Sequence, residues 1–299
     1  MATSTSQLTS DVLVTALHGE LKLDVAVTGH RGHAYELGRD AAIDGLDLVV
    51  VLGGDGTVNE VVNGLLAEGP HGQLPALGIV PGGSTNVLAR SLGLPNDPVE
   101  ATGTLLGALR QERHRTIGLG RADDRWFTFC AGFGLDAEVV AAVEEHRTAG
   151  ASPTPGLYVR TAISHFFRGT DRSKPALELS RPGLPDRDGL FLAIVANTRP
   201  WTYLGTRPVD PCPQASFDSG LDLFALSSLR TASTLRQVRR MLSPRPLVPR
   251  GRTVVNVHDA GEFTLRAARP TAFQVDGDHL GARQEVRFTA HPAALRIAG

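Results

Sequence analysis

The sequence has little cysteine, few aromatic residues and no long apolar run, and each shortage excludes a class of protein. Two cysteines among 299 residues, Cys130 and Cys212, cannot form a disulfide framework, and no Cys/His spacing typical of a metal site accompanies them. This fits a reducing cytoplasm, where we expect the protein to act. No segment approaches the roughly 18 consecutive apolar residues that a membrane-spanning helix needs. The first residues lack the basic start and apolar core of a signal peptide.

The sequence also lacks an excess of charge of either sign. It contains 30 basic and 31 acidic residues, a net charge of −1, which argues against a nucleic-acid partner. Aromatic residues make up 5% of the chain, but apolar residues as a whole make up 41%, enough for ordinary hydrophobic cores. A chain of 299 residues is long enough for two domains.

The most informative feature that is present is a glycine-rich turn after an apolar strand. Residues 48–52 are apolar, residues 53–56 read Gly-Gly-Asp-Gly, and apolar residues then recur at helical spacing from Val58 to Leu66. Glycine allows positive φ and a close approach of the main chain to a phosphate, and the N–H groups of a following helix face such an anion. Thr57 and Glu60 predict a capping box at the start of this helix.

A second turn of this kind follows the next apolar strand, over residues 77–80. It reads Pro-Gly-Gly-Ser-Thr-Asn over residues 81–86, and a short helix is expected over residues 87–92. Either turn alone is equally well explained as an ordinary strand–helix turn or helix cap. Two such turns on consecutive parallel strands open at the same sheet edge, which favours a phosphate site. No lysine follows the glycines, and the acidic Asp55 beside phosphates implies Mg²⁺.

The pattern of predicted strands and helices changes near residue 117. Alternating strands and helices precede it, including a helix capped by Asp97 with Pro98 at its first position. Short strands with frequent Gly/Pro turns follow, which is typical of an antiparallel sandwich. We therefore expect an α/β domain over residues 1–117 and a β domain over residues 118–299, with a return of the last residues to the first domain left open. Asp276 and Gly277, taken alone, predict an ordinary hairpin turn.

Four motifs in this order resemble the diacylglycerol kinase catalytic-domain family. Residues 53–60 and 81–90 resemble its two glycine turns, and residues 132–136 resemble its G-x-G-x-D element. Residues 276–278 resemble its Asp-Gly-Glu, and Asn197 stands where an asparagine ends a strand of the second domain. This family contains bacterial lipid kinases and is related to the sphingosine and ceramide kinases. The resemblance extends over nearly the whole chain.

The resemblance implies both a fold and an activity. The fold is an α/β nucleotide-binding domain like that of NAD kinase and phosphofructokinase, then an antiparallel β-sandwich that carries the lipid site, with a cleft between the two. The activity is transfer of the γ-phosphoryl group of ATP, with Mg²⁺, to a lipid hydroxyl. We expect diacylglycerol as the acceptor, giving phosphatidic acid in phospholipid biosynthesis. A sphingoid base or another lipid alcohol is the alternative, and a catalytically inactive nucleotide-binding module is the alternative of another class.

The resemblance also implies site residues and partners. Asp276 is the expected general base, Asp55 belongs to the metal and phosphate network, and Asp136 holds a metal or bridging water. Asp278 replaces the family glutamate, is shorter by one methylene, and is expected to act through water. The expected nucleotide contacts are Thr28, Gly53, Gly54, Asp55, Gly56, Thr57, Asn59, Glu60, Gly83, Ser84 and Asn86. The protein would meet its lipid at the membrane surface as a peripheral protein, with a homodimer left open.

The chain departs from the family pattern at its start. The hydrophobic strand that opens these kinases is missing, and we favour a start placed too late over a true loss. Residues 25–28 predict the next strand, ending at Thr28. Ser219 stands where some bacterial members have an acidic ligand near Asp218, so we expect no structural Mg²⁺ there.

Two apolar segments have two interpretations each. Residues 157–174 read as an amphipathic helix that either faces the membrane or is buried with a basic end. Trp201, Tyr203 and Leu204 lie on a loop, where they line an acyl pocket or pack the loop itself.

Overall fold

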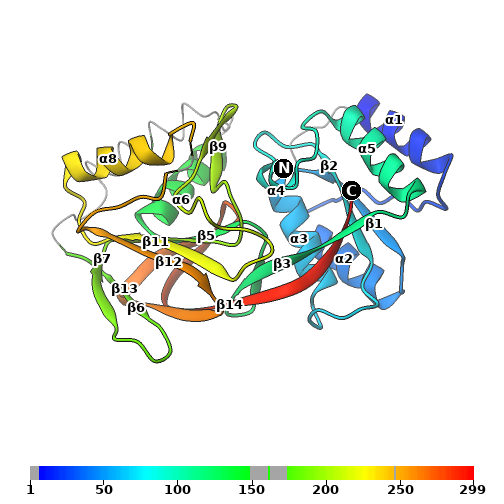
Figure 1. Ribbon diagram of the computed structural model, residues 1–299. Coiled ribbons are helices and arrows are strands. Elements are labelled where there is room, and N and C mark those ends of the chain that lie inside the picture. Colours follow the sequence, from blue (N-terminus) through cyan, green and yellow to red (C-terminus); the bar gives the residue numbers. More distant parts are fainter. Residues whose placement is uncertain (1–6, 149–160, 162–173, 246) are drawn as a thin grey trace. The chain divides into compact units, whose positions relative to one another are not determined.

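The computed structural model describes residues 7–148, 161, 174–245 and 247–299 of the protein, and these belong to two compact units (Figure 1). Unit 1 comprises residues 1–118 and 293–299, and unit 2 comprises residues 119–292. Strand β14 (Asp278–Ala298) begins in unit 2 and ends in unit 1.

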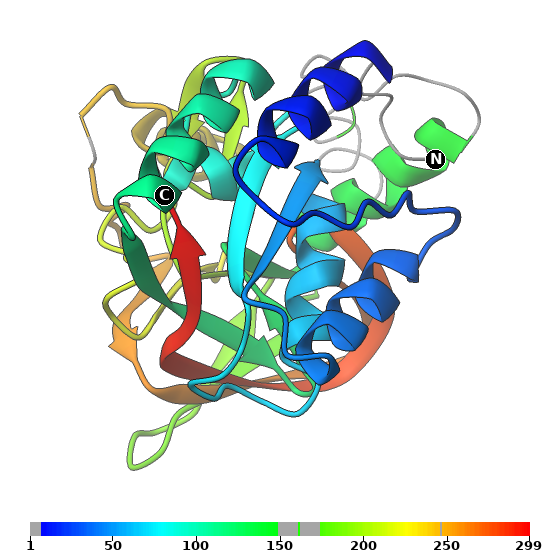
Figure 2. The same ribbon diagram turned by 90° about the vertical axis from the view of Figure 1, so that its right-hand side faces the viewer.

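Unit 1 is a parallel sheet with helices. Its helices are α1 (Gln7–His18), α2 (His33–Ile43), α3 (Asp55–Leu65), α4 (Val87–Ser91) and α5 (Pro98–Arg110). Strand β1 (Leu48–Gly53) pairs in parallel with β2 (Ala76–Pro81), and the end of β14 pairs in parallel with the other edge of β2. Figure 2 shows this end of β14 in red beside β2 in cyan. Every residue of β2 is buried, as its unbroken apolar sequence leads one to expect for a central parallel strand.

Two helix features of unit 1 follow directly from side-chain chemistry. The Asp97 carboxylate accepts hydrogen bonds from the backbone N–H groups of Val99 and Glu100, which confirms the predicted cap of α5. Helices α2 and α3 pack through glycines. A Cβ on Gly64 would lie 2.1 Å from the carbonyl oxygen of Tyr35, so only glycine permits this approach.

The strand predicted over residues 25–28 is wrong. These residues form no regular element, and the side chains of Val25 and Val27 are 56% and 84% exposed. Among the residues that the structure describes, β1 pairs with β2 alone. The β-branched side chains favour an extended conformation, but without a neighbouring strand their backbone groups have no ladder to join.

Unit 2 is an antiparallel β structure. Its strands are the end of β3 (His114–Ala122), β4 (Arg125–Phe127), β5 (Cys130–Gly134), β6 (Leu177–Ser180), β7 (Arg187–Leu190), β8 (Leu192–Ala196), β9 (Thr202–Leu204), β10 (Arg207–Val209), β11 (Leu221–Leu226), β12 (Val254–Ala260), β13 (Glu262–Val275) and most of β14. The order β14-β13-β5-β8-β11-β12 forms its main sheet. Helices α6 (Leu135–Thr148) and α8 (Thr231–Met241) belong to the same unit.

Strand β13 pairs with two different strands along its length, and the sheet around it encloses an apolar core. Its first half pairs with β6 and its second half with β5, and the register with β14 shifts between Arg266 and Thr271. The side chains of Phe127, Phe133, Phe263 and Phe288 pack in the enclosed core, each at most 1% exposed. A second apolar cluster lies on the other side of β8 and β11 and includes Leu135 of α6 and Met241 of α8.

The hairpin turn between β13 and β14 has the predicted form. Val275 pairs with Asp278, which leaves Asp276 and Gly277 as a two-residue loop. Their φ values are 48° and 83°, the positive values of a type I′ turn. Aspartate and glycine are among the residues that tolerate this conformation, so the local sequence alone accounts for the turn.

Candidate active site

The two glycine turns of unit 1 are in direct backbone contact. The N–H of Gly82 donates to the carbonyl oxygen of Gly53 at 2.9 Å. A Cβ on Gly83 would lie 2.6 Å from the Cα of Gly54, closer than real Cβ contacts. Gly54 itself is extended, with φ −90° and ψ 178°, so the expectation of positive φ in this turn is wrong for this glycine. What the turns require is the absence of side chains between them.

Asp55 fastens the second turn to the first. It is the first residue of α3, and its carboxylate oxygens accept hydrogen bonds from the N–H groups of Val87 at 2.9 Å and Leu88 at 3.1 Å. These are the first N–H groups of α4, where a negative charge is stabilised. Backbone N–H groups therefore stabilise the negative charge of Asp55, for which the sequence predicts Mg²⁺ as the only partner.

Two buried asparagines shape the same region. Asn86, at φ 49°, accepts from the N–H of Gly83 and donates to its carbonyl oxygen, each at 2.9 Å. The amide oxygen of Asn59 in α3 accepts from the side chain of Asn63. Both residues are nearly inaccessible, at 4% and 1% exposed. We infer that Asn86 holds the second turn in place and that Asn59 stabilises α3, rather than that either reaches out to a nucleotide.

The predicted capping box of α3 is wrong. The helix begins at Asp55, so Thr57 is already its third residue, and the Gly54 cap makes no side-chain bond. Glu60 instead accepts from the N–H of Gly32 at 3.1 Å, directly before α2. Glu60 thus joins the start of α2 to α3. Thr28 lies before α2 in the irregular segment and is half-buried.

The start of α3 keeps groups that an anion can use. The first bond within the helix turn runs from the N–H of Val58 to the carbonyl oxygen of Gly54 at 3.1 Å. The N–H groups of Gly56 and Thr57 precede it, and Ser84 in the second turn is exposed. An eleven-residue helix starting in a glycine turn is the arrangement that binds phosphate groups.

A buried polar network forms the candidate site of unit 2, and Asp276 is at its centre. Its carboxylate is 4% exposed and accepts from the N–H and hydroxyl of Thr128 at 2.7 and 2.8 Å, and from the N–H groups of Phe129 and Cys130 at 3.0 Å each. Burial raises the pKa of Asp276, and these hydrogen bonds oppose that shift. A carboxylate whose acceptor positions are occupied by the protein argues against the expected role of Asp276 as proton acceptor. Its geometry is that of a residue that positions the segment 128–130.

Asp136 stands near Asp276 in the same network. It is the second residue of α6, and its carboxylate accepts from the side-chain amide of Gln274 at 2.8 Å. Burial raises the pKa of Asp136 to about 6, and the hydrogen bond from Gln274 opposes the shift. A Cβ on Gly132 would lie 1.6 Å from a carboxylate oxygen of Asp136, so glycine at position 132 makes room for this carboxylate.

Gln274 connects Asp136 to the turn that contains Asp276, and sequence reasoning missed it. Its amide oxygen accepts from the N–H of Gly277 at 2.9 Å, while its nitrogen donates to Asp136. Asn197 adds a hydrogen bond to the carbonyl oxygen of Thr128 at 2.9 Å. The sequence did contain a signal for it, because Gln274 is an amide side chain among the otherwise apolar residues 272–275. Asp278, half-buried, directly follows the turn that this network holds.

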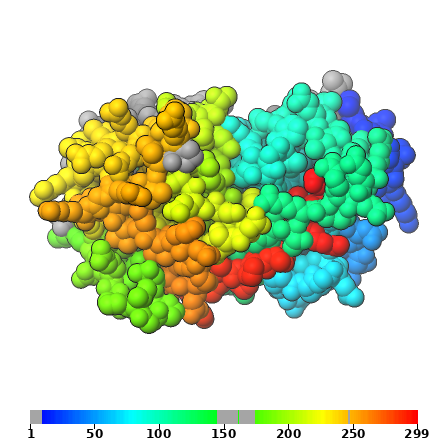
Figure 3. All heavy atoms as spheres, in the orientation of Figure 1, coloured from blue at the N-terminus to red at the C-terminus, as the bar shows by residue number. Residues whose placement is uncertain are grey.

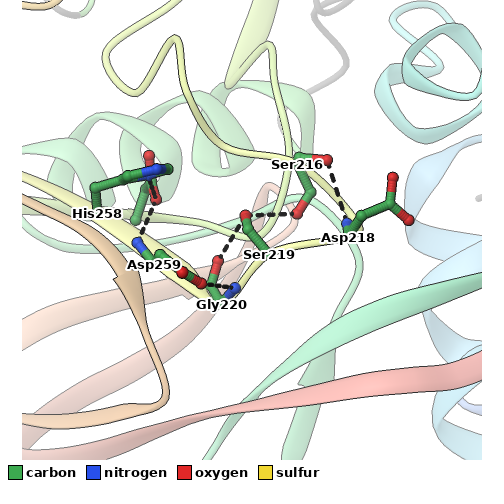
Figure 4. Close-up of polar contacts among 7 residues, drawn as sticks. Ser216, Asp218, Ser219, Gly220, His258 and Asp259 are labelled. Carbon is green, nitrogen blue, oxygen red and sulfur yellow. Dashed lines mark hydrogen bonds and ion pairs between the residues drawn. The ribbon is translucent and has the colours of Figure 1, made fainter.

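A separate set of polar contacts surrounds Ser219, as Figure 4 shows. The Ser219 hydroxyl donates to the carbonyl oxygen of Ser216 at 3.1 Å, and the N–H of Gly220 donates to the Asp259 carboxylate at 2.6 Å. Asp222 accepts from the N–H of Asp259 at 3.0 Å and contacts His258 Nδ1 at 2.7 Å. Burial raises the pKa of Asp222, and these two contacts oppose the shift.

The donor groups limit how a metal can bind. Within the described ranges of the chain, no three His, Cys, Asp or Glu residues gather as ligands for an ion. Mg²⁺ at phosphoryl-transfer sites is held by one or two carboxylates together with water and phosphate oxygens. Asp55 and Asp136, which do not cluster with other candidate ligands, fit that mode, in which the nucleotide supplies part of the ligand set.

The apolar segments singled out in the sequence fall in two places. Trp201 and Leu204 pack against the second apolar cluster of unit 2. The predicted amphipathic helix over residues 157–174 lies almost wholly outside the described residues. No helix in the part of the chain that the structure describes is long and apolar enough to cross a membrane.

An α/β unit with two joined glycine turns, followed by an antiparallel β unit, defines the class of NAD kinase-like and diacylglycerol kinase-like folds. A diacylglycerol kinase structure from Bacillus anthracis str. Sterne superposes with a TM-score of 0.74 at 21% identity, over 99% of this chain and 93% of that one. An NAD kinase structure from Archaeoglobus fulgidus, in complex with ATP, gives a TM-score of 0.52 at 10% identity, over 99% and 90% of the two chains.

The sequence comparisons identify the family. The diacylglycerol kinase catalytic domain matches residues 3–122. The protein named "Probable lipid kinase YegS-like" of Pseudomonas aeruginosa strain UCBPP-PA14 is 30% identical over 92% of this chain and 84% of its own length. A Bacillus subtilis protein named "Diacylglycerol kinase" is 38% identical over 109 residues, which span 36% of this chain and 34% of that relative. The chain belongs to the diacylglycerol kinase catalytic-domain family, a family of lipid kinases.

Proposed function

We propose that the protein transfers the γ-phosphoryl group of ATP, with Mg²⁺, to the hydroxyl of diacylglycerol and forms phosphatidic acid. The observation that carries the proposal is the pair of glycine turns joined by Asp55 at the start of α3. Phosphoryl transfer depends mainly on positioning and charge neutralisation, and rigid backbone N–H donors supply both. The names of the Bacillus subtilis and Bacillus anthracis relatives support diacylglycerol as the acceptor.

In this proposal unit 1 binds the phosphates of ATP. The N–H groups of Gly56 and Thr57 and the hydroxyl of Ser84 donate to phosphate oxygens, and Gly53, Gly54 and Gly83 keep the approach free of side chains. Bound Mg²⁺, with Asp55 or Asp136 among its ligands, would neutralise charge on the transferred group. Thr28, close before α2, completes the nucleotide contacts that we propose.

Unit 2 supplies the proton acceptor. Asp276 is committed to the N–H groups of residues 128–130, so we assign proton acceptance to Asp278, which is half-buried and directly follows the same turn. Gln274 and Asp276 hold that turn from its buried side. Asp278 is one methylene shorter than glutamate, so a single water can relay the proton from the lipid hydroxyl. We place the reaction at the surface of the membrane that holds the lipid, on its cytoplasmic side.

A panel of acceptors tests the proposal. The protein is incubated with γ-labelled ATP and Mg²⁺ in mixed micelles that contain diacylglycerol, ceramide or sphingosine as the single alcohol. We expect label in phosphatidic acid and much slower labelling of the two sphingolipids. Preferential labelling of sphingosine or ceramide would transfer the assignment to that lipid. ATP binding without transfer to any acceptor would support the inactive nucleotide-binding module instead.

A further inference from the structure

One stretch of unit 2 departs from the even charge balance of the chain. Between Asp222 and Asp259 the sequence contains no acidic residue, although acidic and basic residues are nearly equal in number overall. The same stretch contains the arginines Arg230, Arg236, Arg239, Arg240, Arg245, Arg250 and Arg252. A local excess of this size attracts an anionic partner and is unnecessary for folding a small β unit.

The fold gathers these arginines on one surface around α8. The buried side of the helix contains Gln237 and Met241. The side chains of Gln237 and Arg240 both donate to the carbonyl oxygen of Arg250, at 3.2 and 3.0 Å, which holds residues 247–252 against the helix. Arg236, Arg239, Arg245 and Arg252 are exposed. Within the described part of the chain, none of the seven arginines forms an ion pair with a carboxylate.

Large apolar side chains project from the same surface. Leu235 and Val238 are 62% and 42% exposed on α8, and Leu247 in the adjoining segment is 48% exposed. Residues 235 and 238 are three positions apart and therefore share a helix face, on which Arg239 also lies. Figure 3 shows the yellow and orange atoms of this region on the outside of unit 2. We call this set of exposed arginines and apolar side chains the α8 surface.

The combination of charge and apolar side chains distinguishes among anionic partners. A soluble polyanion would be bound by the arginines alone and would leave Leu235, Val238 and Leu247 in water. At a membrane surface the apolar side chains enter the boundary between headgroups and acyl chains. The arginines then reach the lipid phosphates, and each basic residue near an anionic leaflet strengthens binding.

The position of α8 agrees with this partner. The N–H of Asp210, just after the β9–β10 hairpin, donates to the carbonyl oxygen of Met241 at the end of α8, at 3.0 Å. Met241 also belongs to the apolar cluster against which Trp201 and Leu204 pack. Figure 1 shows α8 and β9 on the same side of unit 2. The C-terminal end of α8 therefore adjoins the hairpin that the sequence marks as a candidate for acyl contacts.

We propose that the α8 surface docks unit 2 onto a membrane that contains anionic phospholipid. The proposal deepens the lipid-kinase function proposed above and rests on it for its biological purpose. The docking itself requires neither ATP nor diacylglycerol, because it uses the headgroup charge and the acyl boundary of the bulk lipid. An experiment can therefore contradict the docking proposal without contradicting the kinase proposal, and the reverse.

Vesicle co-sedimentation of the full chain tests the docking. One set of vesicles contains phosphatidylcholine alone and the other contains phosphatidylcholine with phosphatidylglycerol, both without diacylglycerol or ATP. We expect binding to the anionic vesicles that weakens with salt. The variant Arg236→Gln/Arg239→Gln should bind them about 30-fold more weakly, from the contribution of two basic residues near a charged leaflet. Leu235→Ser should bind about tenfold more weakly, because an apolar side chain no longer enters the boundary.

Two matched variants of unit 2 serve as controls. Arg187→Gln/Arg283→Gln removes the same charge from exposed positions elsewhere, and Leu184→Ser makes the same change at an apolar side chain that is 49% exposed. Both should bind like the unchanged protein, and the melting temperatures of all variants should agree. Equal binding of the α8 variants and their controls would overturn the proposal. Loss in the arginine variant alone, with Leu235→Ser unaffected, would also overturn it, because it would show that the apolar side chains of the α8 surface do not enter the acyl boundary.

Discussion

Asp276 and Asp278 are separated by one glycine but occupy different environments. The Asp276 carboxylate is enclosed by the N–H groups of residues 128–130, whereas Asp278 is half-buried at the start of β14. Asp276 lies in a type I′ turn and Asp278 directly follows it, so their sequence context does not separate a positioning role from proton acceptance. The hydrogen bonds of Asp276 and the greater exposure of Asp278 do.

Replacing Asp278 tests proton acceptance. Asp278→Asn removes the acceptor charge, and we expect kcat to fall by roughly 10²–10⁴, the usual effect of losing a general base. The KM for ATP should change little. Asp278→Glu restores a carboxylate with longer reach and should retain most of the turnover. Steady-state kinetics with micellar diacylglycerol measure all three proteins, and near-normal turnover of Asp278→Asn would contradict the assignment.

Replacing Asp276 should instead weaken the fold. Asparagine tolerates the positive φ of this position, but its amide nitrogen cannot accept the hydrogen bonds that a carboxylate oxygen accepts. One or two buried N–H groups then lose their acceptor, and the free energy of unfolding should fall by ~2–4 kcal/mol. Urea denaturation compares Asp276→Asn with Asp278→Asn, which should remain stable. A loss of turnover in Asp276→Asn with unchanged stability would return proton acceptance to Asp276.

The raised pKa of Asp136 predicts a pH dependence of stability. The pKa is about 6 in the folded protein, against an ordinary value near 4 when unfolded, because burial disfavours the charged form. The folded state therefore binds a proton more readily between about pH 4 and pH 6. Its contribution to stability is complete below that window and is lost as pH rises through it, on the order of 3 kcal/mol.

The variant Asp136→Asn isolates this contribution. Its uncharged side chain still accepts the hydrogen bond from Gln274, so it should lose less stability than the unchanged protein between about pH 4 and pH 6. Urea denaturation at several pH values, with a chelator present, gives the difference between the two curves. Parallel curves would show that Asp136 titrates normally in the folded protein.

At the scale of elements, the phosphate site depends on how β1, α3, β2 and α4 meet. No single element forms the site, because Asp55 starts α3 and bonds to the start of α4. The two turns approach closely only because residues 54 and 83 are glycines. Glycine at each turn is therefore a requirement of packing between elements rather than of backbone conformation.

A methyl group on Gly83 should separate the two turns. Its Cβ would lie 2.6 Å from the Cα of Gly54, so the backbone must move. We expect Gly83→Ala to weaken ATP binding at least tenfold, since displaced N–H donors no longer converge on one phosphate. Gly103→Ala is the control, because a Cβ there meets nothing within 4 Å. Isothermal titration with ATP measures both, and equal affinities would contradict the phosphate-binding interpretation.

At the scale of the whole molecule, the last residues of the chain complete the sheet of unit 1. Ile297 and Ala298 pair with Leu77 and Gly78 of β2, and Arg296 donates to the carbonyl oxygen of Leu74 at 2.8 Å. The remainder of β14 pairs with β13 in unit 2. One strand thus contributes to both units, so a change at the C-terminal end should destabilise the nucleotide-binding unit.

Truncation of one buried side chain tests this link. Ile297 is 2% exposed, and Ile297→Ala should lower the free energy of unfolding by ~2–4 kcal/mol through lost burial and a cavity. Ile43→Ala makes the same change at a side chain that is 72% exposed and should shift stability by less than about 0.5 kcal/mol. Denaturation experiments in which the release of bound ATP is the signal measure the effect on unit 1. Similar shifts in the two variants would show that the C-terminal strand is dispensable for unit 1.

Local sequence patterns determined many elements of this protein. The helix start at Asp97, the apolar strands β1 and β2 and the two-residue turn at Asp276 and Gly277 have local physical causes, and the structure confirms each of them. The order of the motifs also sufficed to identify the family and its fold. These features depend on residues close together in the chain, where capping, periodicity and turn preferences act.

Tertiary structure alone decided which carboxylates form hydrogen bonds with distant parts of the chain. Residues far apart in sequence, such as Asp55 with Leu88 or Asp276 with Cys130, form the contacts that assign each carboxylate its role. The segment 25–28 has the composition of a strand, but a strand needs a neighbour, and composition does not supply one. Hydrogen-bond partners, burial and the resulting pKa values depend on three-dimensional neighbours, so they follow from packing and not from local sequence.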